Sequence, residues 1–521
     1  MLTVAKSLLF SALIGCATLV SNESVLQGII LAPNEESLKN CPTSPHEVVN
    51  CQVALPGNGK KLLDILRAKY LEQPLTEEEM VKVKRAIIRF YRSEGHPAVD
   101  VQIRELKNGF VAFIITDKEG VFRSGRVISR SHLEKYIDIA TGENIAQDLL
   151  LTNVDYLNRN PFRRSIVLFP PDSQEGTSDL KLINDKFPVR FFLGGDNSGT
   201  RFTGRSRIYG GLTWDHVLGL DDVIHYQYSC NPNLHKFQSH YGTYIAFFPW
   251  KNILTVSGLY EKTEGGKQLQ TTFRYTVPLE PINKAFKQEG TMGLNYKNLN
   301  TNRFFIDTGP IRTHFVNLIQ LYINYSLERA WKKNELTCAL EVFLAPGKVL
   351  ANQSDSSFSA LRPHAKNKYI YVRGTLGDLY KLPHNFSLAG LLRFQLATSP
   401  LLPSEQFGLG GYNTVRGYYE RTLNADDALC VNAELRFPSI SLIRKGKDEL
   451  IFLGFIDYGL GFNLDPSSGN PSREHLLGLG PGLRYQIDTH FSLRGDWGFQ
   501  LHKLSGRNPQ SVAHVGVVGL F

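Results

Sequence analysis

Few residues in this sequence have the types and spacing that catalysis requires. Gly478, Gly480 and Gly482 mimic part of a dinucleotide-binding loop, but no strand followed by a helix surrounds them. The sequence contains neither a Gly-Xaa-Ser-Xaa-Gly nor a His-Glu-Xaa-Xaa-His motif, and its 14 histidines are dispersed. We therefore expect no enzyme activity, no catalytic residue and no cofactor.

The cysteines allow one specific cross-link. Cys41 and Cys51 are close enough in sequence to form a bridge in an oxidising compartment. A metal site built from Cys41, His46 and Cys51 would lack a fourth ligand, so we expect no bound metal. Loss of Cys16 by processing would leave an odd number of cysteines, which excludes a complete disulfide framework. The remaining three are expected to be apolar fillers or intermolecular thiols: Cys230, Cys338 and Cys430.

The first twenty residues have the composition of an export signal. Lys6 precedes an apolar stretch at 7–14 that is too short to span a bilayer. Two interpretations of its processing stay open, namely ordinary cleavage near Ala17 or acylation of Cys16 in a lipobox-like motif. Either way, residues 1–20 are predicted to be a signal peptide.

The net charge of +9 could indicate a nucleic-acid partner. The basic residues are scattered, however, and no RNA- or DNA-binding motif accompanies them. A membrane barrel with a polar, wet interior explains the same charge, because its strands alternate apolar and polar side chains. We therefore expect no nucleic-acid partner.

Residues 46–120 follow the order strand, helix, helix, strand, strand, after a linker or plug-like segment at 21–45. The second helix begins at Thr76, and Glu79 follows three residues later as in a capping box. The predicted elements are a strand at 47–55, helices at 60–70 and 76–95, and strands at 98–106 and 109–116.

The same order recurs over residues 121–188. The predicted elements are a strand at 121–129, a helix capped by Ser131, a helix at 146–159, and strands at 164–169 and 177–183. Two successive units of about 70 residues indicate an internal structural duplication.

Short motifs accompany both units. Tyr-Arg-Ser-Glu-Gly-His at 91–96 leads into a strand, and Asp-Lys-Glu-Gly stands at 117–120. These motifs resemble the polypeptide-transport-associated (POTRA) domain. The second unit, through residues 157–161 and 176–180, resembles the second POTRA domain of two-partner secretion transporters, the haemolysin secretion/activation family. The resemblance implies POTRA 1 at 46–120 and POTRA 2 at 121–188.

From residue 189 to 521 the sequence predicts repeated short strands and no long helix. Apolar and polar residues alternate over 222–230, 387–397 and 491–501. Alternation of this kind suits a soluble sandwich or a membrane barrel, because each has one apolar and one wet face.

The C-terminus favours the membrane barrel. Val515, Val517, Gly519 and Phe521 share one face of a final strand. This pattern resembles the signal by which the barrel assembly machinery recognises bacterial outer-membrane barrels. We therefore expect a mainly β protein, with a transmembrane antiparallel β-barrel at 189–521 in contact with outer-membrane lipids. It would follow two α+β POTRA domains, which would lie in the periplasm, and the family resemblance implies about 16 strands.

Two segments of the barrel region are similar to family signatures. Phe-Leu-Gly-Gly-Asp-Asn-Ser-Gly-Thr at 192–200 and Leu-Gly-Leu-Asp-Asp at 218–222 look like the opening of a two-partner transporter barrel. The segment 404–411 runs into a Val-Arg-Gly-Tyr motif that resembles the signature loop of the superfamily of outer-membrane insertases and secretion pores. The motif consists of Val415, Arg416, Gly417 and Tyr418.

In that superfamily the loop folds into the lumen, and its arginine pairs with an aspartate of the barrel wall. The matching aspartate here is Asp457, and Glu434 is a competing carboxylate because it alternates inward along its strand. Arginine suits this purpose because its planar, permanently charged fork matches a carboxylate. Without the resemblance, the sequence pattern alone favours a solvated loop residue at Arg416.

The resemblance implies an outer-membrane transporter. Its POTRA domains would bind an unfolded, secreted partner polypeptide at an exposed sheet edge by β-augmentation, and its barrel would pass that polypeptide outward. Two alternatives remain. An insertase that assembles other barrels usually carries more POTRA repeats, and a passive porin would need none.

Overall fold

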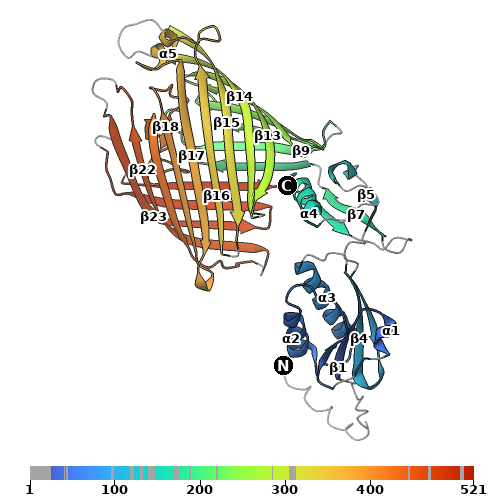
Figure 1. Ribbon diagram of the computed structural model, residues 1–521. Helices are drawn as coiled ribbons and strands as arrows, with labels where there is room; N and C mark the ends of the chain where they lie inside the picture. Colours follow the sequence, from blue (N-terminus) through green and yellow to red (C-terminus); the bar gives the residue numbers. More distant parts are fainter. Residues whose placement is uncertain are drawn as a thin grey trace, which may run out of the picture. The chain divides into compact units, whose positions relative to one another are not determined.

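The computed structural model describes most of the chain in two compact units (Figure 1). The first unit comprises residues up to Asn158 together with Arg164–Asn184, and the second comprises Arg159–Arg163 with Asp185–Phe521. The predicted signal peptide, Cys16 included, lies outside the described residues. These are 25–39, 41–42, 45–94, 99–117, 123–129, 133–138, 147–168, 177–186, 189–218, 221–283, 285–303, 312–331, 333–443, 446–466, 471–504 and 510–521.

A four-stranded sheet opens the first unit, in the order β2-β1-β4-β3. β1 is parallel to both β2 and β4, and β3 is antiparallel to β4. The strands are β1 (Gly28–Ala32), β2 (Val48–Asn50), β3 (Val99–Glu105) and β4 (Phe110–Asp117), and a short 3₁₀ turn, η1 (Lys107–Gly109), joins the last two.

β1 corrects the predicted start of this domain. All five of its residues are buried, and the strand lies between β2 and β4 at the centre of the sheet. The prediction of a linker or plug-like segment over 21–45 is therefore wrong for residues 28–32. The predicted first strand at 47–55 forms only the short edge strand β2. This strand was not predicted because a five-residue apolar run that is buried on both faces shows no alternation of apolar and polar residues. The polar residues on either side of the run indicated a linker instead.

Two helices cover one face of this sheet, α2 (Gly59–Tyr70) and α3 (Glu77–Ser93). Thr76 caps α3 through its Oγ1, which accepts the backbone N–H of Glu79 at 3.2 Å. The predicted apolar stripes of both helices are buried in one core with β1, β3 and β4, led by Leu62, Leu66, Val83, Ile87 and Tyr91.

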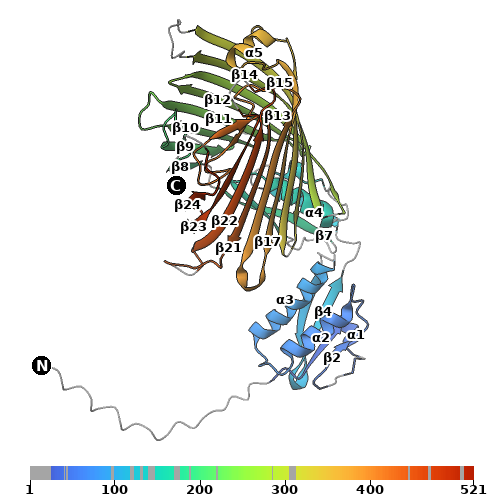
Figure 2. The same cartoon turned by 90° about the vertical axis from the view of Figure 1, so that its left-hand side faces the viewer.

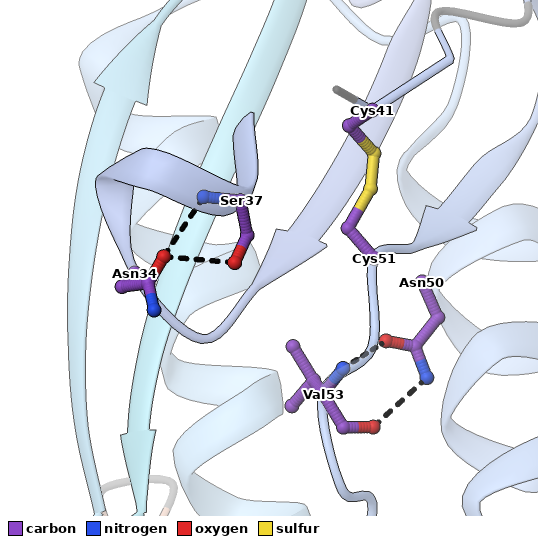
Figure 3. The surroundings of a disulfide bond; sticks show 6 residues. All are labelled: Asn34, Ser37, Cys41, Asn50, Cys51 and Val53. Atoms are coloured by element: carbon purple, nitrogen blue, oxygen red, sulfur yellow. Dashed lines mark hydrogen bonds between the residues drawn. A yellow bond between two sulfur atoms is a disulfide. The ribbon is translucent and has the colours of Figure 1, made fainter. Parts of the chain in front are cut away.

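A disulfide and a short helix, α1 (Glu35–Leu38), border the opposite face (Figure 3). The bond joins Cys41 to Cys51, the residue that follows β2. Cys51 packs in a small core with Ile30, Ala32, Phe110 and Ala112. The disulfide thus fastens the crossover between β1 and β2 to the sheet.

The second sheet of the first unit repeats the arrangement. Its order is β5-β7-β6, and β5 is parallel to β7, just as β1 is parallel to β4 in the order β1-β4-β3. The predicted duplication is therefore visible as a shared topology. Where a helix capped by Ser131 was expected, the described residues contain a 3₁₀ turn. The elements are β5 (Arg123–Ser129), η2 (Glu134–Tyr136), α4 (Gln147–Leu157), β6 (Arg163–Leu168) and β7 (Thr177–Lys186).

The segment Arg159–Arg163 belongs to the second unit. Both guanidinium nitrogens of Arg163 donate to the Asp221 carboxylate, at 3.0 and 2.9 Å, and both side chains are buried. Asn160 donates to Asp215 at 2.7 Å. These buried polar bonds tie the segment to the β9–β10 turn of the barrel.

Sixteen antiparallel strands form a closed barrel, which β25 completes by pairing with β8 (Figures 1 and 2). The predicted fold class is confirmed. The predicted strands at 222–230 and 387–397 coincide with β10 and β18. The strands are β8 (Val189–Asp196), β9 (Arg207–Asp215), β10 (Asp222–Cys230), β11 (Phe237–Phe247), β12 (Ile253–Thr263), β13 (Gly266–Ile282), β14 (Phe286–Arg303), β15 (Arg312–Ala330), β16 (Asn334–Pro346), β17 (Lys368–Lys381), β18 (Ser387–Ala397), β21 (Asp427–Arg436), β22 (Asp448–Phe462), β23 (Arg473–Ile487), β24 (Phe491–Gln500) and β25 (Ser511–Leu520).

Alternation along each strand separates an apolar outer face from a lined interior. On β22 the outward Phe452 and Ile456 are each 47% exposed, whereas the inward Phe455 and Asp457 are buried. On β25 the outward Val515 is 47% exposed and the inward His514 is buried. An apolar outer belt around a polar interior is the pattern of a barrel that faces lipid.

The connections differ between the two ends of the barrel. At one end the strands are joined by short turns, such as 382–386, which contains η3 (Pro383–Asn385). At the other end lie longer loops. One, at 347–367, carries the helix α5 (Asp355–Leu361), and another, at 398–426, carries the paired strands β19 (Phe407–Leu409) and β20 (Leu423–Ala425).

Candidate functional site

Residues 398–426, here called the lumenal loop, fold back inside the barrel. Their buried side chains contact inward-facing residues of the wall strands instead of extending into solvent. The buried residues of the loop include Leu401, Leu402, Glu405, Leu409, Val415, Arg416, Tyr418 and Asp426. A buried loop must satisfy its polar groups within the protein, and the lumenal loop does so mainly through charged side chains.

Arg416 and Asp457 form a bidentate pair. Nε and Nη2 of Arg416 donate to the two carboxylate oxygens of Asp457, at 2.7 and 2.8 Å, and the backbone N–H of Arg416 donates to the same group at 3.0 Å. The guanidinium also stacks on the Phe455 ring, with its central carbon 3.6 Å from the ring centroid. The side chains of Arg416 and Asp457 are 3% and 0% exposed, so the pair is almost fully removed from water.

Two further carboxylates share the Arg416 guanidinium. Nη1 donates to Glu434 at 2.7 Å and to Asp496 of β24 at 3.3 Å. The structure therefore brings both predicted partners, Asp457 and Glu434, to the same arginine. Asp496 was not predicted as a partner. Its inward alternation on β24 was visible in the sequence, but only strand register places it beside β22.

Three more arginines complete the network. Arg436 pairs with Glu434, Arg494 pairs with Asp496, and Arg484 contacts both carboxylates. With Arg416, four arginines thus face three carboxylates among the described residues, which leaves this network with a net positive charge. Burial alone would lower the pKa of Arg416, but its bonds to Asp457 and the neighbouring carboxylates raise that pKa above its ordinary value. Arg416 is therefore permanently charged.

Glycine is required at several positions where the backbone of the predicted motif packs against the backbone of the barrel wall. A Cβ at Gly417 (φ +94°) would lie 2.9 Å from the backbone of Gly498, and one at Gly478 would lie 2.0 Å from the carbonyl oxygen of Arg416. The Gly417 carbonyl accepts from the side chain of Gln500 at 2.7 Å, and its N–H donates to His514 Nε2 at 3.2 Å. The loop backbone thus lies directly on β23, β24 and β25.

Tyr418 and Val415 complete the motif. The Tyr418 hydroxyl donates to the carbonyl oxygens of Leu477 and His502. Val415 is fully buried in an apolar cluster with Leu409 and Cys430. All four motif residues are therefore held against strands β21 to β25.

A polar cavity of about 250 Å³ lies beside Arg416. Its lining includes Tyr412, Thr414, Glu434, Arg436, Arg484 and Arg494. Water in this cavity can reach the arginine network without the loop being displaced, so this end of the loop borders a hydrated space.

Comparison with known proteins assigns this arrangement to a family. The model of the haemolysin secretion/activation protein ShlB/FhaC/HecB matches residues 176–485, which is more than half of the chain. The chain belongs to the haemolysin secretion/activation family. The predicted resemblance is thereby confirmed, and so is the predicted outer-membrane location of the barrel.

One curated relative is the outer membrane transporter CdiB of Dickeya dadantii (strain 3937). It is 23% identical over 339 residues, which cover 60% of this chain and 57% of that protein. This member of the haemolysin secretion/activation family therefore matches somewhat more than half of the relative's length.

Solved structures share the fold. CdiB from Escherichia coli superposes with a TM-score of 0.66 at 17% identity, covering 98% of this chain and 93% of that one. CdiB from Acinetobacter baumannii gives 0.59 at 15% identity, covering 96% and 90%. BamA from Haemophilus ducreyi lacking POTRA domains 1–3 gives 0.57 at 14% identity, covering 88% and 97%.

The remaining predicted residues of this family member that the structure describes belong to the first sheet and to the last barrel strand. Cys41 and Cys51 are joined in the first unit. Val515 and Val517 face outward on β25, with Gly519 at the next outward position, and Phe521 exchanges backbone hydrogen bonds with Phe191. Within the described part of the chain, no cluster of His, Cys, Asp or Glu is arranged to hold a metal.

Proposed function

We propose that this chain transports an unfolded partner polypeptide across the outer membrane in two-partner secretion. The observation that carries the proposal is the lumenal loop, which lies inside a closed sixteen-strand barrel and is held there by buried ion pairs, among them the Arg416 network. A transport path through this lumen requires that the loop shift, and the network with its adjoining cavity is where such a shift would begin.

The two small sheets support the binding step. We assign them as periplasmic POTRA domains, the first beginning near residue 25 instead of 46 and the second extending to about 186. Among the described residues, β3 pairs only with β4, so one edge of the first sheet is open. An extended polypeptide could add to this edge through backbone hydrogen bonds, which bind without requiring a particular sequence.

Deletion of this protein, with comparison of the cell-surface and medium proteomes, tests the proposal. Loss of one large exoprotein, restored by the wild-type chain, is the expected result. General loss of outer-membrane barrels would instead indicate an insertase. Ion conductance by the purified barrel, without any change in secreted proteins on deletion, would indicate a passive porin.

A further inference from the structure

Glu405 lies in the lumenal loop eleven residues before Arg416 and is fully buried. Its Oε1 accepts from Lys297 Nζ at 2.7 Å and from Ser404 Oγ at 2.9 Å. Its Oε2 accepts from Gln320 and from the Tyr371 hydroxyl, each at 2.9 Å. Four donors therefore surround one carboxylate, and one of them is a nearly buried cation.

The donors come from a different part of the wall than the partners of Arg416. Lys297 lies on β14, Gln320 on β15 and Tyr371 on β17. Along the closed strand order, β24, which carries Asp496, is the eighth strand after β14 in a ring of sixteen. Lys297 and Asp496 thus stand on opposite walls. Eleven extended residues reach at most about 40 Å, so the loop between them can cross the lumen.

The surroundings of the two ends also differ. Leu401 and Leu402, beside Glu405, are fully buried in an apolar core with Phe358 of α5 and with Tyr371. Figures 1 and 2 show α5 at the end of the barrel beside β14 and β15. Cavities border both ends, one of about 310 Å³ beside Gln406 and the polar one beside Arg416, but the carboxylates differ, since Glu434 is 13% exposed and Glu405 is not exposed.

We propose that Glu405 is a second anchor of the lumenal loop, a positioning residue that keeps residues 400–406 on the β14–β17 wall while the Arg416 end is released. This inference rests on the proposed function, because it describes how the loop moves during transport. Glu405 is fully buried and its cation Lys297 is only 10% exposed, whereas the outer arginines of the Arg416 network are 24–33% exposed, so water can replace the contacts of that network more readily. During transport the loop would therefore stay attached to the wall at Glu405 while the Arg416 end moves.

The pKa of Glu405 agrees with this arrangement. Burial alone would raise it, but Lys297 and the hydrogen bonds to the carboxylate lower the pKa to about 2. The anchor is therefore ionised under all conditions in which the envelope works.

Thiol labelling of the full-length protein in detergent tests the inference without any transport assay. In a background with Cys230, Cys338 and Cys430 replaced by alanine, Gln406→Cys reports on the Glu405 end and Val415→Cys on the Arg416 end. Both positions are nearly or fully buried. Glu405→Ala should speed maleimide labelling at 406 by about tenfold or more and leave 415 protected, and Arg416→Ala should do the reverse.

The control is Glu335→Ala, which removes another Glu–Lys pair of the barrel, that with Lys381, away from the loop. It should change neither labelling rate. If Glu405→Ala prevents folding, Glu405→Gln with Lys297→Met removes both charges together, leaves no unpaired buried ion and should give the same selective exposure at 406. Exposure of both ends by either anchor variant, or of neither, would overturn the inference.

Export measured in parallel separates the two claims. Glu405→Ala should reduce release of the exoprotein although the barrel assembles. Undiminished export would overturn the claim that Glu405 anchors the loop during transport. A wild-type chain that exports no partner would refute the proposed function, and the labelling rates would still decide whether Glu405 anchors the loop.

Discussion

Arg416 is stable in the lumen because nearly all of its donors are used. A guanidinium removed from water is costly unless it is paired and hydrogen-bonded, and here Asp457, Glu434 and Asp496 accept from it together. The Phe455 ring covers one face of the group. Removal of this side chain would leave these three carboxylates with one cation fewer, so the loop, and not the barrel, should lose stability.

Arg416→Ala should therefore abolish or strongly reduce export while the barrel still assembles. The loss of one partner from a buried ion network costs about 3–5 kcal/mol, which is enough to detach the loop tip. Export and the heat-modifiable migration of the folded barrel would be measured together. Arg329→Ala is a matched control, because Arg329 also stacks on an aromatic ring, that of Trp331, at 3.6 Å, but lies away from the loop. Unchanged export by Arg416→Ala would contradict this account.

Glu420 should make the loop sensitive to pH. Its carboxylate accepts the backbone N–H of Tyr412, and burial raises its pKa from 4.5 to about 7, with Asp196 adding to the rise while Arg421 and Arg494 oppose it. Because the pKa of Glu420 is higher in the closed loop than in a released loop, the protonated form of Glu420 favours the closed loop. This stabilisation of the closed loop is complete below pH 4.5 and is lost as the pH rises through 7.

Labelling of Val415→Cys, in the same background of replaced cysteines, should thus accelerate severalfold between pH 6 and pH 8, after correction for the ionisation of the thiol. The Glu420→Gln variant, which cannot ionise, should show a flat profile over the same range. Equal pH dependence in both proteins would assign the effect to another group.

At the scale of the elements, the sequence was most informative where one face of a strand or helix is apolar. The bounds of β10 and β18 and the buried face of α3 followed from simple periodicity. β1 was missed because burial on both faces removes that periodicity. The Arg416 partners show the same limit, since Asp457 came from family resemblance, whereas Asp496 depends on register between β22, β23 and β24, which periodicity does not contain.

The Cys41–Cys51 disulfide should stabilise β1 in the first sheet. Closing a loop of about ten residues stabilises a fold by about 3 kcal/mol in the chain-entropy model. Cys41→Ser with Cys51→Ser should therefore speed amide hydrogen exchange in β1 by up to about 100-fold, measured in the full-length protein. Replacing the free Cys230 and Cys338 by alanine should leave these rates unchanged. Equal protection of β1 with and without the bridge would show that packing alone holds the strand.

At the scale of the whole molecule, the barrel wall and the lumenal loop are held together by different kinds of interaction. Continuous pairing around sixteen strands makes the wall a rigid frame with no free edge. The loop is fastened to that frame by side chains, whose contacts can be broken and remade while the wall stays paired. The proposed transport therefore requires movement of the loop within a fixed cylinder.

A covalent tether between the loop tip and the wall tests this claim most directly. A Cβ built on Gly459 lies 2.7 Å from Val415 Cγ2, so Val415→Cys with Gly459→Cys places two thiols within bonding reach across the loop–wall contact. The pair would be introduced into the chain lacking Cys230, Cys338 and Cys430, and export of the exoprotein would be measured before and after reduction. The account predicts that export stops when the tether is oxidised and returns to the level of the single-cysteine variants on reduction. Full export with the tether closed would contradict it.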